Sequence, residues 1–190
     1  MLIGVVGLNG SGKDTVASYL AKNKGFDWED CGEEIRVELK KLGKNYLDRN
    51  EMTSLANKMR AEFGADYWVK RLLKKHPSAK NLVISSIRNP SEVELLKSKK
   101  GVIVEVFASI NTRYKRTVDR VKNNPKEHGD VINFNDFKSK EDKELISKDP
   151  TKQQLLKCIS MTEYRLDNNG SLEDLEKEIE LFLKKISKKK

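Results

Sequence analysis

Apolar residues follow two alternating patterns along this chain, and these predict strands and helices in turn. Three apolar runs, residues 2–6, 81–85 and 102–107, are short and rich in β-branched residues, which predicts buried strands. Two weaker segments, residues 26–30 and 162–166, predict a short second strand and a last strand. Helical spacing of apolar residues follows the strands, beginning with residues 13–24. This alternation favours an α/β fold with a parallel sheet and helices on both faces.

The loop between the first predicted strand and helix has the sequence Gly-Leu-Asn-Gly-Ser-Gly-Lys-Asp-Thr over residues 7–15. It fits the phosphate-loop pattern G-x-x-x-x-G-K-[ST], except that Asp14 precedes the hydroxyl residue Thr15. Glycines let successive amides turn inward around an anion, and the next helix adds the positive end of its dipole. Lys13 supplies a point charge for phosphates. The residues predicted to bind the nucleotide here are Asn9, Gly10, Ser11, Gly12, Lys13, Asp14 and Thr15. The alternative is a glycine turn without a chemical role.

Length and composition limit the remaining possibilities. The 190 residues suit one domain, residues 1–190, with a net charge of +9. Cys31 and Cys158 lie far apart without metal-type spacing, so we expect a reduced, cytoplasmic protein whose metal arrives with a nucleotide. The N-terminal strand runs straight into the glycine loop, so we expect no signal peptide, and we expect no membrane span. Lysine runs at 97–100 and 188–190 favour a solvated surface over nucleic-acid binding.

The arginines are placed more informatively than the lysines. Arg36 and Arg88 each follow a predicted strand, where open α/β sheets bind ligands. Arg113, Arg116 and Arg120 are spaced i, i+3, i+7, which places three guanidinium groups on one helix face. Three like charges on one face repel one another, and a polyphosphate bound between them would offset this repulsion. The alternative interpretation is a basic helix that is exposed to solvent.

Two segments look like additions to the sheet. The helical stretch 31–77 predicts an acceptor-binding subdomain, and the polar, loop-rich stretch 122–149 predicts a lid that carries Lys138, Lys140 and Lys143. The chain has many basic residues but no evident Ser/His/Asp or Cys/His set for nucleophilic catalysis. This combination favours phosphoryl transfer over hydrolysis. An acceptor that is itself a phosphate is already anionic and needs no general base.

These motifs occur in the order found in nucleoside monophosphate kinases, of which adenylate kinase is the familiar member. The glycine loop, Cys31–Arg36, Ser85–Pro90 and the arginine helix carry this resemblance over nearly the whole chain. The chain also resembles uncharacterised adenylate-kinase-like P-loop proteins and the kinase-like domain fused to some deoxycytidylate deaminases. The resemblance implies a P-loop NTPase fold, a three-layer α/β/α arrangement with a five-stranded parallel sheet, a helical insertion that binds the monophosphate, and a lid.

The resemblance also implies roles for single residues. ATP and Mg²⁺ are the implied cofactors, with Asp14 and Thr15 near the metal and Asn169 and Gly170 beside the donor base. Arg36 and Arg88 would bind the acceptor phosphate. The residues implied to act on the transferring group are Lys13, Arg88, Arg116 and Arg120.

One departure from the family pattern leaves the function open. Ser85 stands where relatives usually carry an Asp that helps to order Mg²⁺, and Asp14 is a possible substitute. We expect an ATP-dependent kinase of nucleoside or deoxynucleoside monophosphates, acting as a monomer or homodimer on small molecules. The alternatives are a regulatory nucleotide-binding module with little catalysis, a dephospho-coenzyme A kinase-like enzyme, and a nucleic-acid-associated ATPase.

Overall fold

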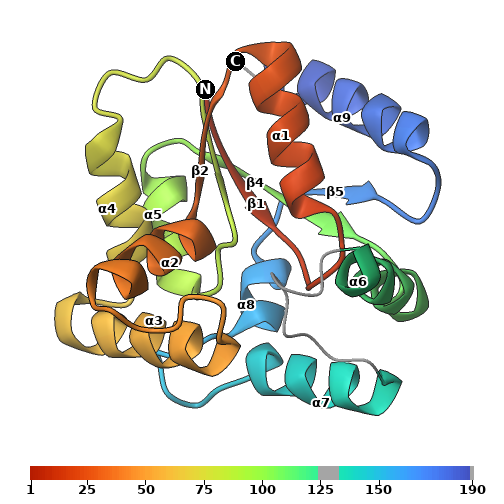
Figure 1. Cartoon of the computed structure of the whole chain (residues 1–190). Coiled ribbons are helices and arrows are strands. Elements are labelled where there is room, and N and C mark those ends of the chain that lie inside the picture. The colour runs from red at the N-terminus through yellow and green to blue at the C-terminus, as the bar shows by residue number, and fades with distance from the viewer. Residues whose placement is uncertain (124–132, 189–190) are drawn as a thin grey trace.

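The computed structural model describes residues 1–123 and 133–188, and these contain a five-stranded parallel sheet (Figure 1). The strand order is β2-β3-β1-β4-β5. The strands are β1 (Leu2–Val6), β2 (Asp27–Asp30), β3 (Leu82–Ser85), β4 (Val102–Phe107) and β5 (Tyr164–Asp167). The predicted α/β fold with a five-stranded parallel sheet is confirmed.

Helices cover both faces of this sheet and give it three layers. They are α1 (Lys13–Lys24), α2 (Cys31–Lys41), α3 (Arg49–Phe63), α4 (Tyr67–Lys75), α5 (Pro90–Ser98), α6 (Ile110–Asn123), α7 (Phe134–Leu145), α8 (Leu155–Ser160) and α9 (Leu172–Ser187). Helices α1 and α9 pack on one face, and α2–α5 with α8 pack on the other. In the sequence, the pair Asp149-Pro150 predicts the start of a helix. The helix begins instead at Leu155, because Asp149 accepts hydrogen bonds from the amide and hydroxyl of Thr151 in a turn.

Strand alternation divides the core in two. In β1, Ile3 and Val5 contribute to the cluster under α1 and α9, whereas Val6 contributes to the cluster on the opposite face. Gly4 lies where a β-carbon would come within 2.8 Å of side-chain atoms of Leu96 and Ile103. A side chain at this position would therefore disrupt the packing of α5 on the sheet.

The sheet gathers its functional loops along one edge. Because every strand is parallel, the loops that follow them emerge at the same edge. Strand β1 lies between β3 and β4, so the chain leaves β1 where the strand order reverses direction, which is the usual ligand position in open α/β sheets. The glycine loop follows this strand.

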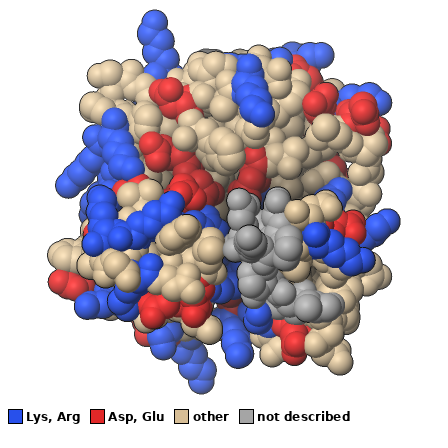
Figure 2. Space-filling view, in the orientation of Figure 1, with Lys and Arg blue, Asp and Glu red and all other residues tan. Residues whose placement is uncertain are grey.

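Charged side chains are mixed over the surface seen in Figure 2. Lys and Arg side chains are scattered among acidic ones on this face rather than gathered in one patch. Residues 124–132, which belong to the predicted lid at 122–149, and residues 189–190 of the terminal lysine run lie outside the described residues. No helix among the described residues is long and apolar enough to cross a membrane.

Candidate functional site

The glycine loop between β1 and α1 has the conformation that an anion nest requires. Gly10 and Gly12 adopt φ angles of 77° and 92°, a region that favours glycine. A β-carbon on Gly10 would lie 2.6 Å from the backbone oxygen of Arg113, so a side chain would also clash there. Lys13 is the first residue of α1 and its side chain is only 10% exposed. The next side chain, Asp14, is 57% exposed and lies 3.7 Å from the Lys13 ammonium.

A partly buried carboxylate that sequence reasoning missed lies beside this loop. Asp30 ends β2 and accepts hydrogen bonds from the Ser85 and Ser86 hydroxyls at 2.6 Å each and from the Glu33 amide at 2.8 Å. Burial would raise the pKa of Asp30, but the Lys13 ammonium and these donors lower it below the usual value. The site therefore holds a charged Asp30 carboxylate at neutral pH.

The backbone after β3 is shaped to hold this carboxylate. Ser86 has a φ of 61°, an uncommon conformation for a residue with a β-carbon. Ser85 pairs with Asp30 in the register of β3 and β2, and its hydroxyl also accepts a hydrogen bond from the Trp28 indole at 3.0 Å. The serine that departs from the family pattern thus positions a carboxylate from the neighbouring strand. Asp30 was missed because only the sheet register brings it to Ser85.

Arg36 reaches the same place from α2. A β-carbon on Gly32 would lie 2.9 Å from Asp30 Oδ1, 3.8 Å from Arg36 Nη1 and 3.9 Å from Ser86 Oγ. The Arg36 side chain is 34% exposed and lies 3.4 Å from the Glu33 carboxylate. Arg36 therefore offers a partly exposed guanidinium beside Asp30.

Arg88 is held at the centre of the site by side chains far apart in the sequence. Its guanidinium donates to the Glu144 carboxylate of α7 and to Asn9 Oδ1 at 3.1 Å. Arg49 also donates to Glu144, at 2.8 Å, so one carboxylate is enclosed by two guanidinium groups. Burial would raise the pKa of Glu144, but Arg88 and Arg49 lower it from 4.5 to about 2. An anion therefore occupies the position between these two arginines.

The three arginines of α6 have different surroundings, and only two of them line the cavity over the glycine loop. Arg113 is buried, pairs with Glu141 of α7, and donates to the Ala108 carbonyl at 3.0 Å. The prediction that all three face a polyphosphate is wrong for Arg113, because Glu141 already neutralises it. Arg116 and Arg120 both line the cavity over the glycine loop.

The turn after β5 contacts the glycine loop through a residue next to the predicted pair. Asn168 is buried, donates to the Ser11 carbonyl at 2.7 Å, and accepts from Arg116 at 3.3 Å. Asn169 accepts from the Ser109 amide at 2.8 Å, at the start of α6. Asn169 and Gly170 do not line the cavity, and their role beside a donor base stays a prediction.

A cavity of about 890 Å³ brings most of these groups together. Its lining contains eight basic and four acidic side chains. The basic residues are Lys13, Arg36, Lys40, Arg49, Arg60, Arg88, Arg116 and Arg120, and the acidic ones are Asp14, Asp30, Glu33 and Glu144. The predicted residues Asn9, Gly10, Gly12 and Thr15 also line it, whereas Ser11 is buried beneath. The described residues contain no cluster of three or more His, Cys, Asp or Glu that could hold a metal ion.

Arg60 is another lining residue that the sequence did not reveal. Its side chain is 1% exposed and pairs with the fully buried Glu92 at 2.8 Å. Glu92 also accepts from the backbone amides of Arg88 and Asn89, at 2.9 Å and 3.0 Å. This ion pair therefore ties α3 to the loop that carries Arg88.

Comparison with known proteins relates this fold to kinases. Residues 3–145 match a family model described as an AAA domain. The UPF0200 protein of Pyrobaculum aerophilum is 30% identical over 181 residues, which cover 94% of each chain. A shikimate kinase of Macrococcus caseolyticus is 29% identical over 124 residues, covering 62% of this chain and 65% of that one. A gluconokinase structure from Sinorhizobium meliloti 1021 covers 98% of this chain and 93% of its own, with a TM-score of 0.59 at 16% identity. The fold is therefore P-loop kinase-like.

Proposed function

Because the chain belongs to the AAA-domain family and to the UPF0200 family, and has a P-loop kinase-like fold, we propose that it transfers a phosphoryl group from ATP to a nucleoside or deoxynucleoside monophosphate. The observation that carries this proposal is the convergence of the glycine loop, Lys13 and several arginines on one cavity. Phosphoryl transfer depends mainly on positioning and on cations around the moving group.

The geometry suggests which group each phosphate would meet. The amides of residues 9–15 and the Lys13 ammonium would bind the donor phosphates, except the Ser11 amide, which donates to the Leu8 carbonyl at 3.1 Å. Arg36 and Arg88 would bind the acceptor phosphate, and Arg88 would then exchange the Glu144 carboxylate, its present partner, for this phosphate. Arg116 and Arg120 would neutralise charge that develops between the two. In this proposal α2–α4 form the acceptor-binding subdomain, and α7 is the helix in the described part of the predicted lid.

The residues present are suited to a nucleotide-bound magnesium ion. Mg²⁺ usually keeps several waters and takes only one or two protein oxygens beside the phosphates. Thr15 and Asp14 were the predicted ligands, and the charged Asp30 carboxylate adds a better fixed oxygen donor. When bound, the ion would neutralise phosphate charge. Asp30 would accept hydrogen bonds from the waters around it.

A coupled assay over all common nucleoside and deoxynucleoside monophosphates tests the proposal. We expect Lys13→Ala and Arg36→Ala to lower kcat/KM by about 10²- to 10³-fold, since each removes a cation from a transferring or bound phosphate. Lys22→Ala is the matched control, because Lys22 is an exposed lysine in the last turn of the same helix. The absence of turnover with every acceptor would contradict the proposal.

A second candidate is transfer to a hydroxyl group, as in a dephospho-coenzyme A kinase-like enzyme. The Asp30 carboxylate in the cavity favours it, because a hydroxyl acceptor needs a group to take its proton and a phosphate acceptor does not. Asp30→Asn should abolish transfer to a hydroxyl of dephospho-coenzyme A but only reduce transfer to a monophosphate. If Asp30→Asn lowers transfer to both acceptors equally, the two candidate functions are not distinguished. The acceptor that the wild type prefers, dephospho-coenzyme A or a monophosphate, then decides between them.

A regulatory nucleotide-binding module and a nucleic-acid-associated ATPase draw less support. The regulatory module was motivated by Ser85, but Ser85 holds the Asp30 carboxylate within the same site. A nucleic-acid-associated ATPase would need a continuous basic surface, whereas on the face seen in Figure 2 the Lys and Arg side chains are mixed with acidic ones. Tight nucleotide binding without transfer to any acceptor would favour the regulatory module.

A further inference from the structure

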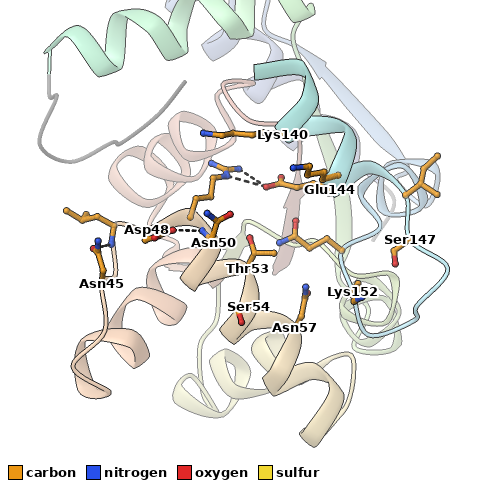
Figure 3. Close-up of a pocket in the computed structure, with 15 residues that line it drawn as sticks. Asn45, Asp48, Asn50, Thr53, Ser54, Asn57, Lys140, Glu144, Ser147 and Lys152 are labelled. Atoms are coloured by element: carbon orange, nitrogen blue, oxygen red, sulfur yellow. Dashed lines mark hydrogen bonds and ion pairs between the residues drawn. The ribbon is translucent and has the colours of Figure 1, made fainter. Parts of the chain in front are cut away.

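A second cavity, of about 1010 Å³, adjoins the cavity over the glycine loop. It lies between α3 on one side and α7 with the loop that follows it on the other (Figure 3). Five residues line both cavities: Leu47, Arg49, Thr53, Glu144 and Gln153. The site proposed for the acceptor phosphate therefore continues directly into this second space, which the phosphate itself would not fill.

The wall formed by α3 is a row of hydrogen-bonding side chains. Asn50, Thr53, Ser54 and Asn57 follow the spacing i, i+3, i+4, i+7, which places them on one helix face. Figure 3 shows these side chains on the part of α3 that borders the cavity. Such a surface offers amide and hydroxyl groups to a ligand rich in oxygen, such as a sugar.

The opposite wall carries positive charge that the described residues neutralise only in part. Lys140 and Lys143 of α7 form no ion pair with any described residue, and Lys152 lies 3.6 Å from the partly exposed Asp149 carboxylate. Of the two acidic side chains that line this cavity, Glu144 is paired with arginines and Asp48 caps α3. Lys140 and Lys143 thus remain available to an anion, and Lys152 shares its charge with the Asp149 carboxylate.

Two aliphatic side chains complete the lining. Leu47 and Ile146 are 38% and 72% exposed, although both are large and apolar. A flat, weakly polar group bound against them would remove this surface from water, which is favourable. Polar, cationic and aliphatic surfaces in one cavity match the parts of a nucleotide.

We propose that the second cavity binds a distal phosphate of the acceptor, so that the acceptor is a nucleotide with two separate phosphate groups, of the type of a nucleoside 3′,5′-bisphosphate. The reacting phosphate lies at Arg36 and Arg88, the sugar contacts the polar face of α3, and the distal phosphate contacts Lys143 and Lys152. This inference rests on the proposed function, because it assigns the acceptor of the same site.

Steady-state kinetics with matched acceptors test this assignment. We expect the wild type to show a KM about tenfold lower for a nucleoside 3′,5′-bisphosphate than for the corresponding 5′-monophosphate at low salt. Added salt should reduce this ratio, because the lysines are exposed. The double variant Lys143→Ala/Lys152→Ala should bring the ratio close to one. Lys58→Ala should keep the wild-type ratio, because Lys58 is an exposed lysine of α3 outside both cavities.

The outcomes separate this inference from the proposed function. Equal KM values for the two acceptors in the wild type, or a ratio that the double variant leaves unchanged, would overturn the distal subsite. Turnover of monophosphates would still support the kinase in that case. If no acceptor is turned over, the proposed function fails, and calorimetric titration with the same two nucleotides decides the subsite by itself. Equal affinity for both would then overturn it.

Discussion

The substitution Glu144→Gln measures how strongly the Glu144 carboxylate binds between Arg49 and Arg88 in the protein without a ligand. The variant keeps the side-chain shape and removes the charge. The pKa of Glu144 is lowered from 4.5 to about 2, which corresponds to about 3 kcal/mol of stabilisation of the folded protein by the charged form. The side chain is 9% exposed, so solvent screening reduces this value little.

Two consequences follow from this magnitude. The variant should lose up to about 3 kcal/mol of unfolding free energy at pH 7, measured by urea denaturation. A ligand phosphate no longer has to displace the carboxylate, so the affinity for a nucleoside monophosphate or pyrophosphate should rise by about 10- to 100-fold, measured by calorimetry. The control is Glu33→Gln, which removes a half-exposed partner of Arg36 and should change stability by less than about 1 kcal/mol.

The pH dependence has a definite sign. Because the folded pKa lies below the unfolded value, the stabilisation by Glu144 is fully present above about pH 4.5 and is lost as the pH falls towards 2. The wild type should therefore lose more stability than Glu144→Gln over this range. Unchanged stability together with weaker anion binding in the variant would refute the reasoning, since it would mean that Glu144 supports the anion site rather than fills it.

Two further substitutions test features of the scaffold. Gly12→Ala should destabilise the protein by more than about 2 kcal/mol and weaken ATP binding, because Gly12 has a φ of 92° and the added β-carbon would collide with the Asn168 amide. The control is Gly43→Ala, which should cost only about 1 kcal/mol, because Gly43 has a φ of 66° but open space around it. Equal unfolding free energies of the two variants would contradict the first prediction. Arg60→Met should lower the unfolding free energy by about 3–5 kcal/mol, because it leaves the buried Glu92 carboxylate without its partner, and Arg60→Met/Glu92→Gln should recover part of the loss. Chemical denaturation measures both, and a change below about 1 kcal/mol in Arg60→Met would refute the second.

The sequence predicted the sheet and the glycine loop because both depend on local patterns. Apolar β-branched runs encode buried strands, and Gly10 and Gly12 encode a turn that other residues resist. The placement of Arg36 and Arg88 in the cavity also followed from their positions just after strands, since parallel strands end at one edge. The sequence was less successful with α6, where spacing alone grouped Arg113 with Arg116 and Arg120.

The partners of these groups could not be read from spacing. Asp30 and Ser85 are 55 residues apart and meet only through the pairing of β2 with β3. Glu144 meets Arg88 across 56 residues and Arg49 across 95 residues. Each of these carboxylates has an ordinary local sequence, so no periodicity marks it.

The sequence by itself therefore determined where strands and helices follow one another along the chain. It also determined the anion nest and the edge of the sheet where cations gather. These follow from backbone preferences and hydrophobic period, which act over a few residues. The tertiary structure alone decided which charges are neutralised, which remain accessible, and which carboxylate lies beside Lys13. Electrostatic pairing depends on distance in space and on burial, and both arise only when segments far apart in the chain pack together.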